Sequence, residues 1–261
     1  KHDELERSLA DLLAGLLARN KQGSPYPRAA ALMEQFLTTT SAPPDHHYRE
    51  AWEAVQRLKN DAIQMEALRC LLGNWLAVVH GSAGTGKTSV ITAFVRLVQA
   101  SGERDLYCIA PTGRAASNIE QRCPSVKGKC STVHSKLNEF SVSRTAKGSG
   151  FCLDEASMAG VGTIHSFLKM YLKTMGPIAV CGDDQQLPAI GTLGGCLLRD
   201  LLRCPQVPRV HLTNIHRQGT GSEICSAALQ IIKSERPTAR GFGDDELDEI
   251  VPDEWRMELV P

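Results

Sequence analysis

Residues 75–100, "WLAVVHGSAGTGKTSVITAFVRLVQA", join an apolar run, a glycine-rich turn and an amphipathic segment. This order predicts a buried strand, a tight loop and a helix in immediate succession. The turn "GSAGTGKT" (81–88) fits G-x-x-x-x-G-K-[ST], in which backbone N–H groups and a helix N-terminus cradle phosphate oxygens. The predicted phosphate site consists of Gly81, Ser82, Ala83, Gly84, Thr85, Gly86, Lys87 and Thr88.

Two residues of this loop and two later carboxylates have individual predicted roles. Lys87 would reach the β- and γ-phosphates of a nucleoside triphosphate, and the Thr88 hydroxyl would bind Mg²⁺. Further along, "FCLDEAS" (151–157) places two acids after an apolar run. We expect Asp154 to hold Mg²⁺ through a water molecule, and Glu155 to act as general base for the attacking water.

The segment "AVCGDDQQLPAI" (179–190) ends another apolar run in acids and amides. Carboxyl ends of parallel strands meet at one edge of a sheet, so Gln186 is expected near the γ-phosphate. Its amide would hydrogen-bond the phosphate or the lytic water. The alternative is a polar turn that is closed by Pro188.

The spacing of apolar runs predicts an α/β fold. Continuous apolar strands that alternate with amphipathic helices are typical of a parallel sheet covered by helices on both faces. The expected strands lie at residues 75–81, 105–111, 150–155, 177–183 and 208–213.

The N-terminal part of the chain is predicted to be helical. "HDELERSLADLLAGLLARN" (2–20) has leucines at helical spacing, "YPRAAALMEQFL" (26–37) predicts a second helix, and a third is expected at about 47–70. "SAPPD" (41–45) is the expected linker, which gives a small helical region at 1–45. A helix that binds a protein partner is the alternative interpretation of the leucine pattern.

The composition sets broad limits on function and location. Twenty-nine basic residues balance 29 acidic ones, so any contact with nucleic acid must come from a local patch. No apolar run reaches the length of a membrane span. Nine cysteines without a Cys-x-x-Cys pair favour free thiols in a reducing intracellular compartment, the cytoplasm or nucleus. Cysteines inside predicted strands are expected to behave as small apolar residues.

The motifs taken together resemble the superfamily 1 helicases over about residues 58–237. Within that superfamily the match is to the RecD-like branch (superfamily 1B), to which the exodeoxyribonuclease V alpha subunit belongs. Gln64 matches the adenine-reading glutamine of the Q motif. Motifs Ia, Ib, II, III and IV match "APTGRAA" (110–116), "STVHSKL" (131–137), "LDEASM" (153–158), "GDDQQLPAI" (182–190) and "LTNIHRQ" (212–218).

The resemblance implies a RecA-like P-loop fold, with ATP and Mg²⁺ as cofactors. It implies single-stranded DNA, or a duplex with a single-stranded tail, as the partner, and movement from 5′ to 3′. Arg217 corresponds to the arginine finger, and His216 stands where the family usually has an aromatic residue. The residues implied in DNA contact are Pro111, Thr112, Gly113, Thr132 and His134.

One departure from the family bears on function. No later motif of the second RecA-like domain is found, so 46–218 is expected to be the first RecA-like domain and 219–261 the start of a second domain or a tail. The leading expectation is an ATP-dependent DNA helicase. The alternatives are an ATP-binding, nucleic-acid-binding subunit that does not unwind by itself, and an RNA helicase of viral type.

Overall fold

A six-stranded sheet forms the centre of the computed structural model, which describes residues 2–123, 129–142, 148–171, 176–187, 189 and 196–216. All neighbouring strands are parallel, in the order β3-β2-β4-β5-β1-β6. The strands are β1 (Leu76–Gly81), β2 (Leu106–Ala110), β3 (Cys130–Thr132), β4 (Gly150–Leu153), β5 (Ile178–Gly182) and β6 (Arg209–Leu212).

The α/β fold with a parallel sheet is therefore confirmed. All five predicted strands form. β1, β2, β4 and β5 are runs of mostly buried residues, whereas β6 alternates between exposed and buried side chains. The sequence did not predict β3, which has three half-buried residues, "CST", and no apolar pattern. It forms because Cys130–Thr132 lies in register with Cys108–Ala110 of β2.

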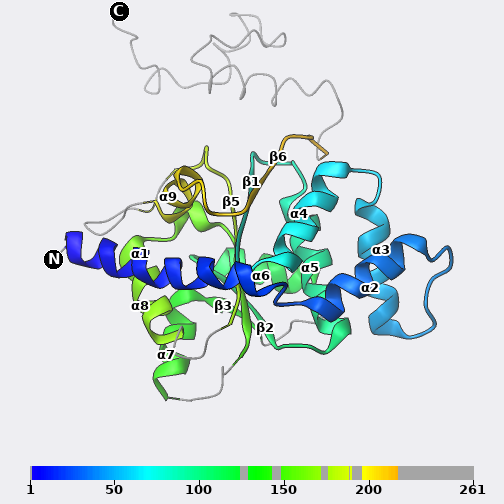
Figure 1. The fold of residues 1–261 in the computed structure, drawn as a ribbon, viewed down its shortest axis with the longest axis horizontal. Coiled ribbons are helices and arrows are strands. Elements are labelled where there is room, and N and C mark those ends of the chain that lie inside the picture. Colours follow the sequence, from blue (N-terminus) through cyan, green and yellow to red (C-terminus); the bar gives the residue numbers. More distant parts are fainter. Residues whose placement is uncertain are drawn as a thin grey trace, which may run out of the picture. The chain divides into compact units, whose positions relative to one another are not determined.

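Helices cover both faces of the sheet (Figure 1). One face packs against α2 (Pro27–Thr38), α3 (His46–Leu58), α4 (Ala62–Gly73), α5 (Lys87–Ser101) and α6 (Gly113–Arg122). The other face packs against α1 (His2–Arg19), α7 (Val133–Val142), α8 (Val161–Tyr171) and α9 (Leu197–Arg203). Alternate residues of β1 enter the two cores, with Ala77 and Val79 in the first and Leu76 and Val78 in the second.

The predicted third helix at about 47–70 is wrong, because the structure has two helices there. α3 ends at Leu58 and α4 begins at Ala62. The break is set by Asp61, whose carboxylate accepts the backbone N–H groups of Ile63 and Gln64 at 2.9 and 3.0 Å. A side chain that satisfies the free N–H groups of a helix start favours a new helix over a continued one.

The leucines of α1 pack against the hydrophobic core of this chain. Leu9 and Leu16 are buried in the core beneath α8, and the neighbouring leucines of α1 pack partly against the same core. On the other face, the Glu103 carboxylate accepts the N–H groups of Arg28 and Ala29, at 2.8 and 2.9 Å, and so caps the start of α2. The N-terminal helices thus contribute to both hydrophobic cores.

The cysteines of the strands are packed as small apolar side chains, as predicted. Cys108, Cys152 and Cys181 are fully buried, and Cys108 lies in register with Cys130 on one side and Cys152 on the other. The eight cysteines that the structure describes carry free thiols. Burial raises the pKa of the Cys70 thiol to about 11, which keeps it protonated.

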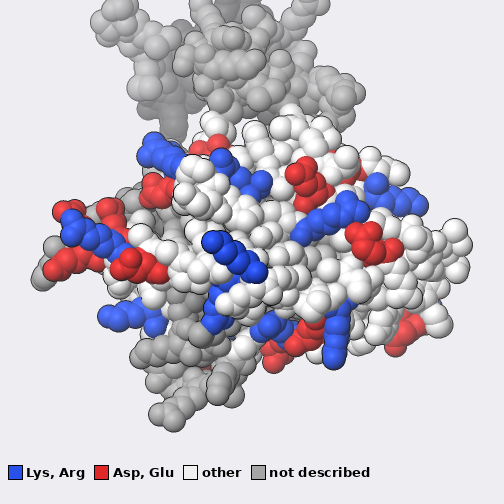
Figure 2. Space-filling model, in the orientation of Figure 1, with Lys and Arg blue, Asp and Glu red and all other residues white. Residues whose placement is uncertain are grey.

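Charges of both signs are interspersed over the face that carries α1 (Figure 2), in keeping with the overall balance. Within the described ranges, no helix is both long enough and apolar enough to cross a membrane.

Candidate nucleotide-binding site

The loop between β1 and α5 has the backbone geometry of a phosphate cradle. Gly84 and Gly86 have φ angles of 87° and 89°, which favour glycine. The turn is closed by Thr85, whose hydroxyl donates to the Ser82 carbonyl at 2.9 Å. α5 begins immediately afterwards at Lys87, so its free N–H groups and the positive end of its dipole face the loop.

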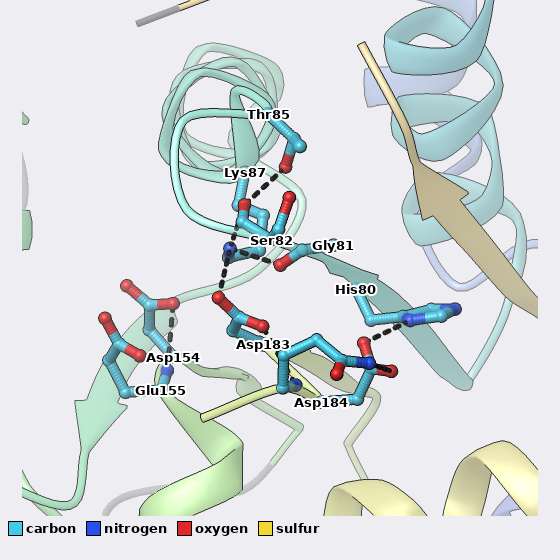
Figure 3. Close-up of polar contacts among 10 residues, drawn as sticks. His80, Gly81, Ser82, Thr85, Lys87, Asp154, Glu155, Asp183 and Asp184 are labelled. Carbon is cyan, nitrogen blue, oxygen red and sulfur yellow. Dashed lines mark hydrogen bonds and ion pairs between the residues drawn. The ribbon is translucent and has the colours of Figure 1, made fainter. Parts of the chain in front are cut away.

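Lys87 is held by its own loop in this structure. Its ammonium donates to the carbonyls of Gly81 and Ser82 at 2.6 and 2.9 Å, and it lies 3.9 Å from a carboxylate oxygen of Asp183 (Figure 3). Asp183 follows β5 directly and is 3% exposed. A bound phosphate would compete with these oxygens for the ammonium.

Asp154 and Glu155 follow the end of β4. Burial raises the pKa of Asp154 to about 6, and the charge of Glu155 adds to the rise, while Lys87 and Arg122 lower it. The Asp154 carboxylate accepts the N–H of Glu155 at 2.9 Å. The Asp154 carboxylate lies beside the phosphate loop, close enough to Lys87 for the ammonium charge to lower the pKa of the carboxylate (Figure 3).

Glu155 has a strained backbone and an unsatisfied carboxylate. Its φ and ψ are 51° and 41°, and it is the one non-glycine residue with positive φ in the described part of the chain. Such a conformation costs on the order of 1–3 kcal/mol. Its Oε2 is buried and has no hydrogen-bond partner among the described residues. Because Glu155 lines the cavity beside the phosphate loop, the turn places this carboxylate at the site.

A cavity of about 350 Å³ brings these elements together. It lies at the carboxyl edge of the sheet, where ligands of open α/β sheets bind. From the phosphate loop it includes Lys87 and Thr88, and from the ends of β4 and β5 it includes Glu155 and Gln186. The complete lining is Ala83, Gly84, Gly86, Lys87, Thr88, Ser89, Arg122, Glu155, Gln186 and His216.

The oxygen donors beside this cavity fit a magnesium ion. Mg²⁺ takes hard oxygen ligands and is usually bound by one or two protein groups together with phosphate oxygens. The Thr88 hydroxyl and the Asp154 carboxylate are donors of this kind. Burial disfavours the charged form of the Asp154 carboxylate, and a nearby cation would stabilise that form.

A second cavity of about 750 Å³ adjoins the first and shares Ser89 and His216 with it. Gln64 lines it and is buried, and its amide donates to the Thr85 carbonyl at 3.3 Å. The predicted adenine-reading residue thus contacts the phosphate loop directly. A nucleotide in the first cavity has room for its base in the second.

Asp61, which lines the second cavity, makes side-chain contacts with two residues that follow β6. Its Oδ2 accepts from the Asn214 amide at 3.0 Å and pairs with Nε2 of His216 at 2.8 Å. The backbone N–H of His216 also donates to the Gly84 carbonyl at 2.8 Å. His216, a departure from the usual family motif, therefore fastens its segment to the phosphate loop. Arg217, the predicted arginine finger, lies outside the described residues.

The residues implied in DNA contact lie together, apart from the nucleotide cavities. The Thr112 hydroxyl caps α6 by accepting the N–H of Ala115 at 3.2 Å, and Pro111 and Gly113 flank it at the end of β2. Thr132 ends β3 in register with Ala110, which places both motifs on one edge. His134 is exposed in the first turn of α7.

Sequence reasoning missed several residues around the site. A carboxylate oxygen of Asp184 lies 2.9 Å from Nδ1 of His80 (Figure 3). The His80 ring stacks on the ring of His211 in β6, with the ring centroids 4.4 Å apart. The acids of "GDD" were a visible signal for Asp183 and Asp184. No sequence signal distinguishes Arg122, which reaches the cavity only through the packing of α6.

Comparisons with known proteins agree with this geometry. The family model described as "AAA domain" matches residues 59–246. The ATP-dependent RecD2 DNA helicase of Deinococcus radiodurans is 29% identical over 237 residues, which cover 87% of this chain and 31% of that protein. An uncharacterized protein of Methanocaldococcus jannaschii is 28% identical over 149 residues, 49% of this chain and 13% of that protein.

A solved structure has the same fold. The Pif1 helicase from Candida albicans superposes with a TM-score of 0.51 at 17% identity, covering 72% of this chain and 46% of that one. The chain spans less than a third of the length of the two curated relatives. The similarity to the Deinococcus helicase agrees with the resemblance of the motifs to the RecD-like branch of the superfamily 1 helicases. Because the family model covers more than half of the chain, including the whole phosphate loop, the chain belongs to the AAA domain family.

Proposed function

We propose that this chain is the ATP-hydrolysing part of a DNA helicase that moves 5′ to 3′ on single-stranded DNA. One observation carries the proposal: a single cavity joins the phosphate loop to Glu155 and Gln186. The RecD-like family and the name of the Deinococcus relative support DNA as the substrate. The direction of movement rests on the family resemblance.

Each residue of the cavity has a separate role in the proposed hydrolysis. Lys87 exchanges its loop carbonyls for the β- and γ-phosphates. The Glu155 carboxylate orients a water molecule and accepts its proton as the water attacks the γ-phosphorus, while the bond from that phosphorus to the bridging oxygen breaks and ADP leaves. Gln186 hydrogen-bonds the γ-phosphate or that water. Thr88 and Asp154 would hold Mg²⁺, which would supply positive charge to the phosphate oxygens.

DNA would bind along the edge formed by the ends of β2 and β3. Thr112 and Gly113 present a hydroxyl and a helix N-terminus to a backbone phosphate. Thr132 and His134 would add a hydrogen bond and a stacking surface for the single strand. We also propose that Arg217 contacts the γ-phosphate as an arginine finger.

The chain organisation forms part of the proposal. Residues 46–218 would be the first RecA-like domain, with 1–45 as an N-terminal helical region and 219–261 as the start of a second domain. A protein partner at the N-terminal helices has one supporting feature, a largely apolar groove of about 410 Å³ between α1, α8 and α9.

A second candidate function is supported by the small fraction of the relatives' length that the chain covers. It spans 31% of the Deinococcus relative, and translocation in this family needs two domains that close around ATP. The chain by itself would then bind ATP and nucleic acid without unwinding.

The test measures ATP hydrolysis with and without single-stranded DNA, together with unwinding of a duplex that has a 5′ tail. Wild type is compared with Glu155→Gln, which keeps the shape of the side chain and removes the base. We expect DNA-stimulated hydrolysis that falls at least a hundredfold in the variant, with nucleotide binding retained (roughly 10²–10⁴-fold for a general base). Binding of ATP and DNA without unwinding would favour the second function, and absence of ATP binding by the folded wild-type protein would refute both.

A further inference from the structure

Arg122 brings a second positive charge to the phosphate cavity. Of the residues that line this cavity, Lys87 and Arg122 are the lysine and the arginine, whose side chains are positively charged at neutral pH. Lys87 enters from the phosphate loop, whereas Arg122 is the last residue of α6 and enters from a different element. The two cations thus approach the cavity independently.

The position of Arg122 is fixed by its neighbours on α6. Ile119 and Cys123 are 2% and 1% exposed, and the N–H of Cys123 donates to the Ile119 carbonyl at 2.9 Å, which closes the last turn. At the other end, Thr112 caps the helix. The backbone from which Arg122 extends is therefore anchored by buried neighbours, and Arg122 itself is exposed.

The guanidinium of Arg122 is available for a ligand. No hydrogen bond or ion pair joins it to any other residue that the structure describes. Lys87, by comparison, has two carbonyls and the Asp183 carboxylate as partners. The charge of Arg122 nonetheless reaches the site, because it lowers the pKa of Asp154.

When a nucleotide is bound, the negative charges around the cavity would exceed the positive charges unless a further cation is present. Asp154, Glu155 and Asp183 bring three carboxylates to this edge of the sheet, and a triphosphate would add several more negative charges. Lys87 alone does not balance them, even with one divalent ion. A guanidinium with five N–H donors is well suited to phosphate oxygens, because it can make two parallel hydrogen bonds.

The other residues of the cavity indicate which phosphate Arg122 would contact. Arg122 shares this cavity with Glu155 and Gln186, which come from strand ends across from the loop, and it is absent from the cavity lined by Gln64. The Glu155 end is where the terminal phosphate and its attacking water would lie. We propose that Arg122 is a catalytic residue that binds the terminal phosphate of ATP from within the first domain.

This inference rests on the proposed ATP hydrolysis and adds a contact that the family motifs do not include. It is independent of Arg217, which follows β6. The two residues would contribute guanidinium groups from separate parts of the chain.

The test compares Arg122→Ala and Arg122→Lys with Arg114→Ala in the full 261-residue chain. Arg114 lies on the same helix, is exposed, and does not line the cavity, so its removal changes the net charge equally. Binding of fluorescent ADP and of a slowly hydrolysed ATP analogue is titrated with Mg²⁺ and without DNA. Thermal unfolding checks that each variant folds.

We expect Arg122→Ala to weaken binding of the ATP analogue roughly 10- to 100-fold and to leave ADP binding within about twofold, as for loss of a charged hydrogen bond. Turnover should fall at saturating ATP, and lysine should restore part of it. Equal effects of the Arg122 and Arg114 variants, or equal losses for ADP and the ATP analogue, would overturn the inference. A wild type that binds the analogue but does not hydrolyse ATP would refute the proposed function while leaving the contact of Arg122 measurable.

Discussion

Replacement of Asp154 by asparagine should stabilise the nucleotide-free protein while it abolishes hydrolysis. The Asp154 carboxyl has an ordinary pKa of 3.8, and burial raises it to about 6. A shift of about two units corresponds to about 3 kcal/mol of unfavourable free energy for the charged, folded form. Asparagine keeps the oxygen that accepts the N–H of Glu155 and removes the charge.

The sign of this effect depends on pH. Between about pH 4 and 6 the folded protein holds a proton on Asp154 that the unfolded chain has lost, so stability falls as the pH rises through this interval. At pH 7.5 the carboxyl is ionised in both states and the folded state carries the full cost. Near pH 4 the carboxyl is protonated in the folded state, and this cost is absent.

The assay is urea unfolding of wild type and Asp154→Asn at pH 7.5 and pH 4.5, with EDTA and without nucleotide. We expect the variant to be more stable by about 2–3 kcal/mol at pH 7.5, with a much smaller difference at pH 4.5. Mg²⁺ with nucleotide should raise the melting temperature of wild type and have a weaker effect on the variant. A variant that is no more stable at pH 7.5, or whose gain is equal at both pH values, would refute the reasoning.

Three further substitutions test the contacts around the site. Asp61→Ala removes the cap of α4 and the pair with His216, and should cost about 1–2 kcal/mol in urea unfolding and weaken ATP binding; unchanged ATP binding would show that the pair does not shape the site. His80→Ala should lower kcat for ATP more than it changes KM. A double-mutant cycle of unfolding free energies should give a coupling between His80 and Asp184 on the order of 1 kcal/mol; additive effects of the two substitutions on stability would contradict this. Glu103→Ala should cost about 1–2 kcal/mol of stability with no change in ATP hydrolysis, since Glu103 caps α2 and does not line the cavity.

Much of the fold could be predicted from local sequence patterns. The strands at 75–81 and 177–183 are continuous apolar runs, and such runs are stable only when buried on both faces. The phosphate loop could be located because its glycines are required by the backbone itself, as the φ angles of Gly84 and Gly86 show. Each of these features depends on a few neighbouring residues, so the sequence alone was sufficient.

The rest of the site depends on contacts between distant parts of the chain. Asp61 pairs with His216, 155 residues later, and this contact exists only because β6 joins the edge of the sheet next to β1. The left-handed turn at Glu155 is a conformation that local preference disfavours, so surrounding structure must impose it.

The sequence by itself determined the parallel α/β sheet, the phosphate loop and the order of the motifs, because hydrophobic burial and glycine geometry act over short stretches. The tertiary structure alone decided which side chains share the cavity. Arg122 reaches it because the burial of Ile119 and Cys123 fixes α6 against the sheet, and no pattern around residue 122 encodes that packing. Strand order and helix packing arise from the summed free energy of many long-range contacts, and these are not visible in any single segment.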